Sequence, residues 1–212
     1  MSGVFVTFEG GEGVGKSTQA LLAAERLAGS GREVLSLREP GGTPVGDRVR
    51  ELLLTPGESM DPVTELLLYE ASRAELVRRV IVPALERGAA VVCDRFTDST
   101  LAYQGYGRGL DVADVRALNA HSTGGVRPDV TVLLTADTET GLERATRAGA
   151  DRIEGESAAF HARVAAGFHF LAVEEPERVL VVDASDDVAT VAAAVWTALS
   201  AHPAVVRWTG VA

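Results

Sequence analysis

The stretch that decides the fold lies near the N-terminus, where residues 4–18 read VFVTFEGGEGVGKST. Its first five residues are apolar or β-branched and predict a buried strand. The glycine-rich segment that follows fits the pattern GxxxxGK[ST], and a helical pattern begins at Ser17. In such a strand–loop–helix unit, consecutive backbone N–H groups curl around a phosphate at the N-terminus of a helix. The sequence therefore predicts a phosphate-binding loop at this position.

The rest of the chain alternates between short apolar runs and helical patterns. Further strands are predicted at residues 33–37, 89–93, 130–134 and 179–182. Helices are predicted at residues 17–28, 45–54, 62–85, 98–105, 112–121, 139–148, 156–174 and 187–199, whereas the residues from 202 onward receive no assignment. Pro83 is expected to kink or shorten the last turn of the helix at 62–85.

Apolar strands separated by helices indicate a parallel sheet that is covered on both faces. Together with the phosphate-binding loop, this pattern predicts an α/β protein with a three-layer P-loop NTPase fold. Its five-stranded parallel sheet would carry helices on both faces. We expect one domain over residues 1–212, with a short lid at about residues 144–156.

The charge balance restricts the class of partner. The 212 residues include 30 acidic and 20 basic side chains, which gives a formal net charge of −10. This balance argues against nucleic acid and against an anionic membrane surface as partners. No apolar run is long enough to predict a membrane-spanning helix. A single cysteine, Cys93, excludes an internal disulfide framework and favours a cytoplasmic location.

The loop and the strand ends carry residues suited to a nucleotide and a metal ion. Lys16, the single lysine of the chain, is expected to reach the β- and γ-phosphates of ATP, and the Ser17 hydroxyl is a candidate Mg²⁺ ligand. Asp94 follows a predicted strand and can hold Mg²⁺ through water, with Arg95 beside it placed for phosphate contact. The expected ATP site comprises Gly10, Gly11, Glu12, Gly13, Val14, Gly15, Lys16, Ser17 and Thr18.

Two further groups of charges stand out. Glu12 lies inside the anion-binding loop, where a carboxylate is costly unless water on Mg²⁺, an arginine or a substrate hydroxyl compensates it. Arg144, Arg147 and Arg152 flank a Gly/Ala segment between two predicted helices. This arrangement suits a mobile lid that closes over phosphates.

These motifs make the chain resemble the thymidylate kinase (dTMP kinase) family of P-loop nucleoside monophosphate kinases. The matching segments are FEGGEGVGKST at 8–18, REPGGT at 38–43, YEASR at 69–73, DRFTDSTLAYQGYGRG at 94–109, RPD at 127–129 and DRIEGES at 151–157. The block at 94–109 is the most specific of them. The resemblance implies that ATP phosphorylates dTMP to dTDP with Mg²⁺ as cofactor, and that the protein is a homodimer formed through helices that include residues 62–85.

The resemblance also implies a role for each matching substrate residue. Glu12 looks like the acid that holds the sugar 3′-hydroxyl, Arg50 and Arg95 match the arginines that grip the dTMP phosphate, and Tyr103 matches a ring that crowds the 2′ position. Tyr69 would stack on thymine and Arg73 would bond a thymine carbonyl. Thr100 and Gln104 match polar contacts to the base and its surroundings, and Glu39 and Pro40 match the loop that shapes the monophosphate site.

The family places a catalytic cation either inside the phosphate-binding loop or in the lid. Residues 11–14 read GEGV and contain no cation. The resemblance therefore implies the lid-arginine type, in which Arg147 or Arg152 supplies the catalytic charge and Arg144 lies beside the ATP base or phosphates.

The chemistry of the implied reaction agrees with the available residues. A phosphate monoester has a second pKa of about 6, so the acceptor is already mostly dianionic at neutral pH and needs no general base. The difficulty is to bring two polyanions together, which cations solve. Two alternatives stay open: another nucleoside monophosphate kinase, since a single methyl group is worth only about 1–3 kcal/mol of discrimination, and a non-catalytic nucleotide-binding module.

Overall fold

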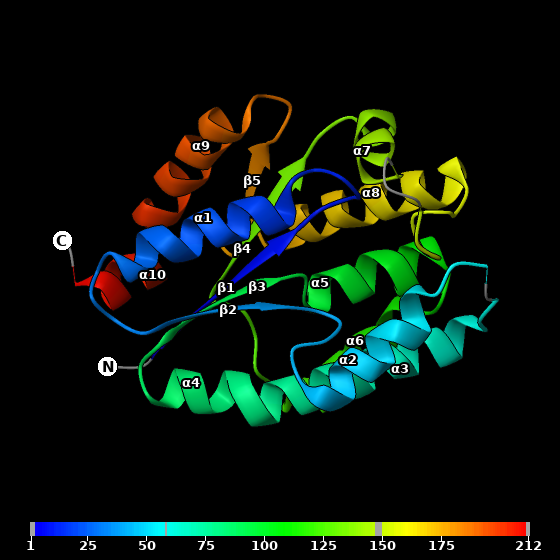
Figure 1. The fold of residues 1–212 in the computed structure, drawn as a ribbon, viewed down its shortest axis with the longest axis horizontal. Helices are drawn as coiled ribbons and strands as arrows, with labels where there is room; N and C mark the ends of the chain where they lie inside the picture. Colours follow the sequence, from blue (N-terminus) through cyan, green and yellow to red (C-terminus); the bar gives the residue numbers. More distant parts are fainter. Residues whose placement is uncertain (1–2, 58, 147–149, 211–212) are drawn as a thin grey trace.

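The computed structural model describes residues 3–57, 59–146 and 150–210 (Figure 1). Its sheet consists of β1 (Val4–Glu9), β2 (Val34–Arg38), β3 (Ala90–Asp94), β4 (Val130–Thr135) and β5 (Val179–Asp183), all parallel and in the order β2-β3-β1-β4-β5. The α/β class and the five predicted strands are confirmed, each strand boundary to within one residue.

The strand order creates a crevice at the carboxyl end of β1. β1 is the central strand, with β3 and then β2 on one side and β4 and then β5 on the other, and the carboxyl ends of such strands are where open parallel sheets bind ligands. Parallel register places Phe8 beside Asp94, so the phosphate-binding loop and the predicted metal-binding acid leave the sheet side by side.

Helices cover both faces of the sheet, as Figure 1 shows. Alternate residues of β1 point to opposite faces, because side chains alternate along a strand. Val6 packs in the core beneath α1 (Lys16–Ala28) and α9 (Val188–Ala201), whereas Phe5 packs against the helices at residues 62–86. The three-layer prediction is therefore confirmed.

The remaining helices mostly follow the predicted positions. They are α2 (Pro44–Leu54), α3 (Pro62–Leu76), η1 (Val77–Ile81), α4 (Val82–Glu86), α5 (Thr97–Thr100), η2 (Leu101–Gly107), α6 (Val112–Thr123), α7 (Thr138–Ala145) and α8 (Ala158–Glu174). The predicted helix at 62–85 contains the π-helical turn η1, in which the Val82 N–H bonds the Val77 carbonyl. Because Pro83 has no N–H to continue the α-helical ladder, the wider turn precedes it.

The C-terminal segment forms a helix that the sequence reading leaves unassigned. In α10 (Pro203–Thr209), the His202 side chain caps the N-terminus and Pro203 occupies its first turn. Trp208 is buried and its Nε1 donates to the Gly88 carbonyl at 2.9 Å. A capping side chain followed by proline was the available signal.

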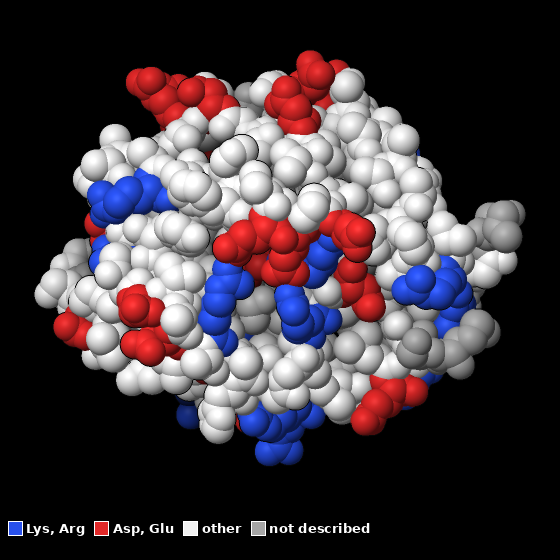
Figure 2. All heavy atoms as spheres, turned by 180° about the vertical axis from the view of Figure 1, so that it is seen from behind, with Lys and Arg blue, Asp and Glu red and all other residues white. Residues whose placement is uncertain are grey.

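Two surface features bear on the class of partner. Among the described residues no single helix has the length and hydropathy to cross a membrane; α9 and α10 pass only when joined, although they bend by 80°. On the face opposite to that of Figure 1, small groups of basic side chains lie beside acidic ones, as Figure 2 shows.

Candidate active site

Glycines shape the phosphate-binding loop because it packs directly on a neighbouring helix. Gly13 has a φ of 65°, and a Cβ at this position would lie 1.9 Å from the Gly141 carbonyl oxygen of α7. No side chain fits there. The loop then enters α1 at Lys16, whose Nζ donates to the Gly11 carbonyl. Burial and the Arg95 charge lower the pKa of Lys16 to about 8, and an approaching phosphate would favour its protonated form.

The two predicted metal-binding residues lie together. The Ser17 hydroxyl donates to Oδ2 of Asp94. Oδ1 of Asp94 is buried and has no hydrogen-bond partner among the described residues. The described residues contain no cluster of three or more His, Cys, Asp or Glu side chains that could hold a metal. A hard cation bound here would therefore complete its ligands with water and phosphate oxygens, as suits Mg²⁺.

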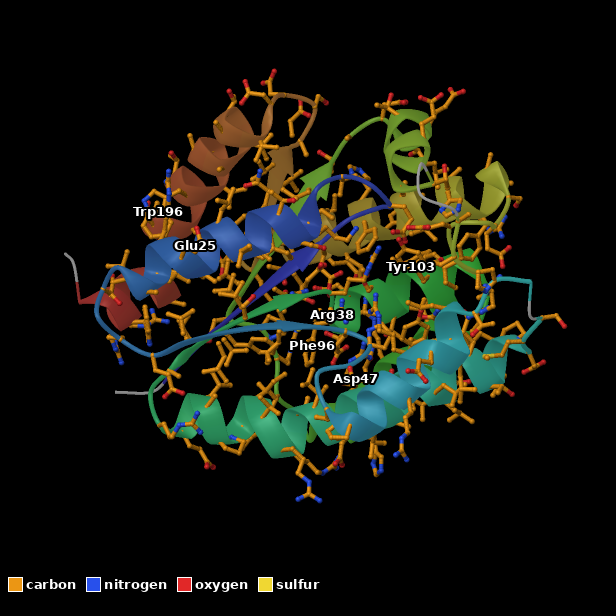
Figure 3. The ribbon with its side chains drawn as sticks, in the orientation of Figure 1. Glu25, Arg38, Asp47, Phe96, Tyr103 and Trp196 are labelled. Carbon is orange, nitrogen blue, oxygen red and sulfur yellow. The ribbon has the colours of Figure 1, made fainter. Side chains whose placement is uncertain are left out.

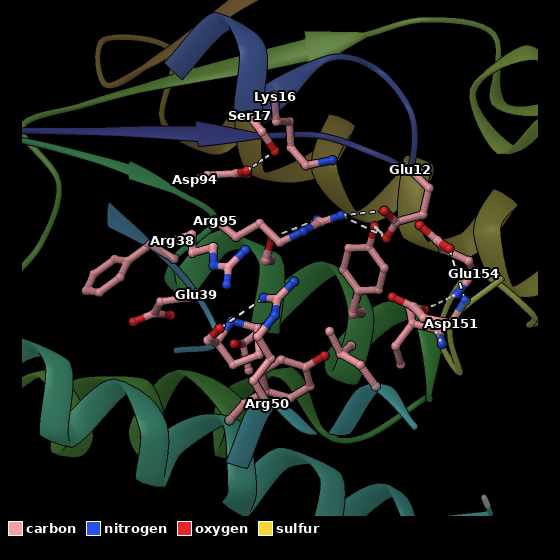
Figure 4. Close-up of a pocket in the computed structure, with 18 of the residues that line it drawn as sticks. Glu12, Lys16, Ser17, Arg38, Glu39, Arg50, Asp94, Arg95, Asp151 and Glu154 are labelled. Atoms are coloured by element: carbon pink, nitrogen blue, oxygen red, sulfur yellow. Dashed lines mark hydrogen bonds and ion pairs between the residues drawn. The ribbon is translucent and has the colours of Figure 1, made fainter. Parts of the chain in front are cut away.

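A cavity of about 420 Å³ opens in front of these groups (Figure 4). Its walls come from the phosphate-binding loop, the loop after β2, the helices α2, α3, α5 and η2, and residues 151–154. Each predicted substrate residue lines this cavity: Glu12, Glu39, Pro40, Arg50, Tyr69, Arg73, Arg95, Thr100, Tyr103 and Gln104. Lys16, Ser17 and Asp94 line it too, so the two predicted nucleotide sites share one space.

Arg95 compensates the negative charge of Glu12. Its Nη2 donates to both carboxylate oxygens of Glu12, at 2.8 and 2.7 Å, and the Tyr103 hydroxyl donates at 2.6 Å. Burial alone would raise the pKa of Glu12, but Arg95, Lys16 and Tyr103 outweigh it and lower the pKa to about 2. Glu12 is therefore ionised at neutral pH, and an arginine is the compensating group of the three anticipated.

Glu9 holds the turn that carries Arg95, a role the sequence reading missed. Arg95 has a φ of 68°, the left-handed region that a bulky side chain adopts only when its surroundings impose it. The buried Glu9 carboxyl accepts from the Phe96 N–H at 2.7 Å and from the Ser99 hydroxyl at 2.5 Å. Burial and the Asp98 charge raise the pKa of Glu9 to about 8. The available signal was an acid at the end of an otherwise apolar strand.

Two arginines form a second cationic group across the cavity. Arg50 donates from Nη1 to the Pro40 carbonyl at 3.0 Å. Burial, and next the charge of Arg38, lower the pKa of Arg50. Arg38, which is labelled in Figure 3, lines the cavity; its side chain has no hydrogen bond or ion pair to any described residue, and Figure 4 shows it near Arg50. Two neighbouring guanidinium groups with free donors are suited to a phosphate. Arg38 belongs to the segment REPGGT at 38–43, but no role is predicted for it from the sequence.

Comparison with known proteins agrees with this geometry. A family model described as thymidylate kinase matches residues 8–195. A thymidylate kinase from Synechococcus sp. is 53% identical over 194 residues, covering 92% of this chain and 94% of that protein. One from Deinococcus radiodurans is 51% identical over 199 residues, covering 93% and 97%. The crystal structure of thymidylate kinase from Ehrlichia chaffeensis aligns with a TM-score of 0.78 at 36% identity, covering 94% of this chain and all of that one.

The chain belongs to the thymidylate kinase family. Members of this family phosphorylate dTMP to dTDP with ATP. The chain is accordingly an ATP-dependent nucleoside monophosphate kinase, and it binds nucleotide substrates.

In this thymidylate kinase fold, protein acceptors bind most of the donors of Arg73. Its Nε donates to Glu39 at 2.8 Å, and Nη1 donates to Glu70 at 3.0 Å and to Asn119 at 2.6 Å. Nη2 donates to the Phe96 carbonyl at 3.1 Å and lies 2.7 Å from Glu39. A guanidinium has five N–H donors; four of them make hydrogen bonds here, and the contact of Nη2 with Glu39 is an ion pair. The base contact implied for Arg73 therefore has at most one N–H available to it, unless one of these bonds is shared or exchanged.

The lid arginines of this family member separate into two groups. Arg147 and the side chain of Arg144 lie outside the described part of the chain. Arg152 is buried away from the phosphate-binding loop, where its Nε donates to the Leu53 carbonyl at 2.7 Å and Nη1 to Glu65 at 2.6 Å. The structure does not bring Arg152 to Lys16, because a buried carboxylate holds it between α2 and α3. Arg152 thus anchors the lid in this conformation.

Proposed function

We propose that the chain transfers the γ-phosphoryl group of ATP to dTMP across this cavity, with ATP on residues 10–18 and the dTMP phosphate at Arg38, Arg50 and Arg95. The observation that carries the proposal is the placing of two separate cationic groups, one at Lys16 and one at Arg38 and Arg50, around a single space of about 420 Å³. Tyr69 lines the same space and offers a face on which a base stacks.

Different charged residues bind ATP and the acceptor nucleotide. Lys16 and the loop amides orient the phosphates of ATP, while Arg38, Arg50 and Arg95 hold the acceptor phosphate in line with them. The ionised Glu12 accepts a hydrogen bond from the sugar 3′-hydroxyl. It also holds Arg95 in place, because it accepts two hydrogen bonds from that side chain. The acceptor is mostly dianionic at neutral pH, so no side chain has to remove a proton before transfer.

Ser17 and Asp94 are the proposed binding residues for Mg²⁺, because the unpartnered Oδ1 of Asp94 and the adjacent hydroxyl fit a hard cation. When bound, Mg²⁺ neutralises charge on the β- and γ-phosphates. Of the two lid arginines considered for catalysis, we assign that role to Arg147, since Arg152 is held by Glu65. Arg144 remains the proposed contact to the base or phosphates of ATP.

We further propose that the protein is a homodimer and that it is located in the cytoplasm. Val63 and Leu67 lie one turn apart on α3 and are each 51% exposed, and Leu52 of α2 is 52% exposed. These apolar side chains support an interface that includes the helix at 62–85. The buried free thiol of Cys93 is consistent with a reducing compartment. Light scattering of the native protein and of Leu67→Asp tests the dimer: the native mass should be twice that of the chain, and the variant should shift toward monomer.

A coupled assay of ADP release tests the proposed function. The wild-type protein should turn over dTMP faster than dUMP, dCMP, AMP or GMP. Lys16→Ala should lose about 10²–10³-fold in turnover while its circular dichroism stays unchanged. Arg147→Ala should lose turnover with an unchanged melting temperature, whereas Arg152→Ala should lower the melting temperature. Near-normal turnover in Lys16→Ala, or no release of ADP with dTMP, would overturn the proposal.

A further inference from the structure

Glu65 of α3 joins several elements of the site although no role has been given to it. Its carboxylate is fully buried. Oε1 accepts from Gln104 Nε2 at 2.8 Å and from Arg108 Nε at 3.0 Å. Oε2 accepts from Arg108 Nη2 at 2.9 Å and from Arg152 Nη1 at 2.6 Å. One carboxylate therefore binds η2 and the lid to α3.

These partners keep Glu65 ionised. Burial would raise the pKa of the carboxyl, but the hydrogen bonds from Arg108, Gln104 and Arg152 outweigh burial and hold the pKa below its usual value. An ionised carboxylate only accepts hydrogen bonds. The group that faces it from Gln104 must therefore be the amide nitrogen, and the opposite orientation would place two oxygens against each other.

The orientation of the Gln104 amide determines which polar atoms it offers to a ligand in the cavity. Gln104 is buried and lines the cavity with Tyr69 and Thr100. With Nε2 held by Glu65, its Oε1 has no hydrogen-bond partner among the described residues, and it is not among the buried polar atoms sealed from solvent. The amide thus presents a carbonyl acceptor to the base, together with the second hydrogen of Nε2 as a donor.

We propose that Glu65 is a positioning residue that makes the base site selective for a pyrimidine with an N–H between two carbonyls, by fixing the amide orientation of Gln104. Thymine and uracil carry this N–H and a neighbouring carbonyl, which complement the carbonyl and the N–H of the amide. Cytosine reverses both groups, with a ring-nitrogen acceptor beside an amino donor, and needs the amide turned over. This inference rests on the proposed function, in which dTMP occupies the cavity.

The pair dTMP and 5-methyl-dCMP isolates the effect, because the two nucleotides have nearly the same shape and differ in this hydrogen-bonding edge. The wild-type enzyme should prefer dTMP by roughly 10³-fold or more in kcat/KM, since a site built to bond a polar group rejects an analogue that lacks it. In Glu65→Gln, the new side chain can donate as well as accept, so the Gln104 amide can turn over. The preference should fall at least tenfold, through a higher KM for dTMP and a lower KM for 5-methyl-dCMP.

A matched control distinguishes loss of the Gln104 amide orientation from a general loss of stability or activity. Arg108→Lys weakens the ion pair with the same carboxylate but keeps a cation that holds Glu65 ionised, so the acceptor that orients Gln104 remains and the dTMP preference should stay within about threefold of wild type. If Glu65→Gln does not fold, the double variant Glu65→Gln/Arg108→Leu removes the carboxylate with one of its cations and reports the same ratio. A folded variant without Glu65 that keeps the wild-type preference overturns the inference. Failure of the wild-type enzyme to phosphorylate dTMP would instead refute the proposed function.

Discussion

Replacing Arg73 by Met tests whether the buried ion-pair network holds the substrate loop in place. Arg73 is 1% exposed and pairs with Glu39 at 2.7 Å and with Glu70 at 3.0 Å, both of which are buried. Methionine fills much of the volume but leaves two buried carboxylates without their cation. Breaking such a pair from one side costs about 3–5 kcal/mol. In a domain of this size, that corresponds to a loss of roughly 6–20 °C in melting temperature.

The cost should depend on pH in a defined direction. Burial already raises the pKa of Glu39 to about 7, against the attraction of Arg73. Without Arg73 the pKa of Glu39 rises further, and an acid whose folded pKa is raised contributes stability that is lost as the pH increases through that value. The destabilisation of Arg73→Met should therefore be larger at pH 8 than at pH 6.

Urea denaturation followed by circular dichroism at both pH values measures this effect. Arg87→Met is the matched control, because Arg87 and Glu33 form an ion pair in which each side chain is 51% exposed. Pairs of this kind contribute little, so no clear change is expected. If Arg73→Met proves as stable as the control, Arg73 does not hold the network together. A large rise in the KM for dTMP without loss of stability would then favour the base contact implied by the resemblance.

Three further predictions concern the loop, the sheet and the C-terminal helix. Gly13→Ala should raise the KM for ATP at least tenfold, because its Cβ meets the Gly141 carbonyl, and Gly11→Ala, with open space around it, should have a smaller effect. Wild-type stability in urea should fall between pH 6 and pH 9, because the folded pKa of Glu9 is raised to about 8, and Glu9→Gln should flatten this profile. Trp208→Ala should lose about 3–5 kcal/mol of stability; calorimetry showing no change would mean that α10 does not close the core.

Much of the site could be predicted from the sequence because its signals are local. The glycine spacing at residues 10–17 is what allows consecutive backbone amides to curl around a phosphate, so the sequence pattern itself indicates the loop. Ser17 and Asp94 are each predicted to bind Mg²⁺, the first from the loop pattern and the second because the carboxyl end of a parallel strand lies at the ligand crevice. Most of the predicted cavity residues lie in the segments at 38–43, 69–73 and 94–109, which resemble those of one family.

The partners of each charged side chain depended on tertiary structure. The sequence shows Arg95, Arg152 and Arg73 as equivalent cations, but the fold binds the first to Glu12, the second to Glu65 and the third to Glu39. These contacts join residues 34 to 87 positions apart, and no local spacing encodes them. Burial then decides which acids stay ionised, since the same carboxyl group has a lowered pKa in Glu12 and a raised one in Glu9. The sequence by itself determined where phosphates bind, and packing decided which charges remain free to bind them.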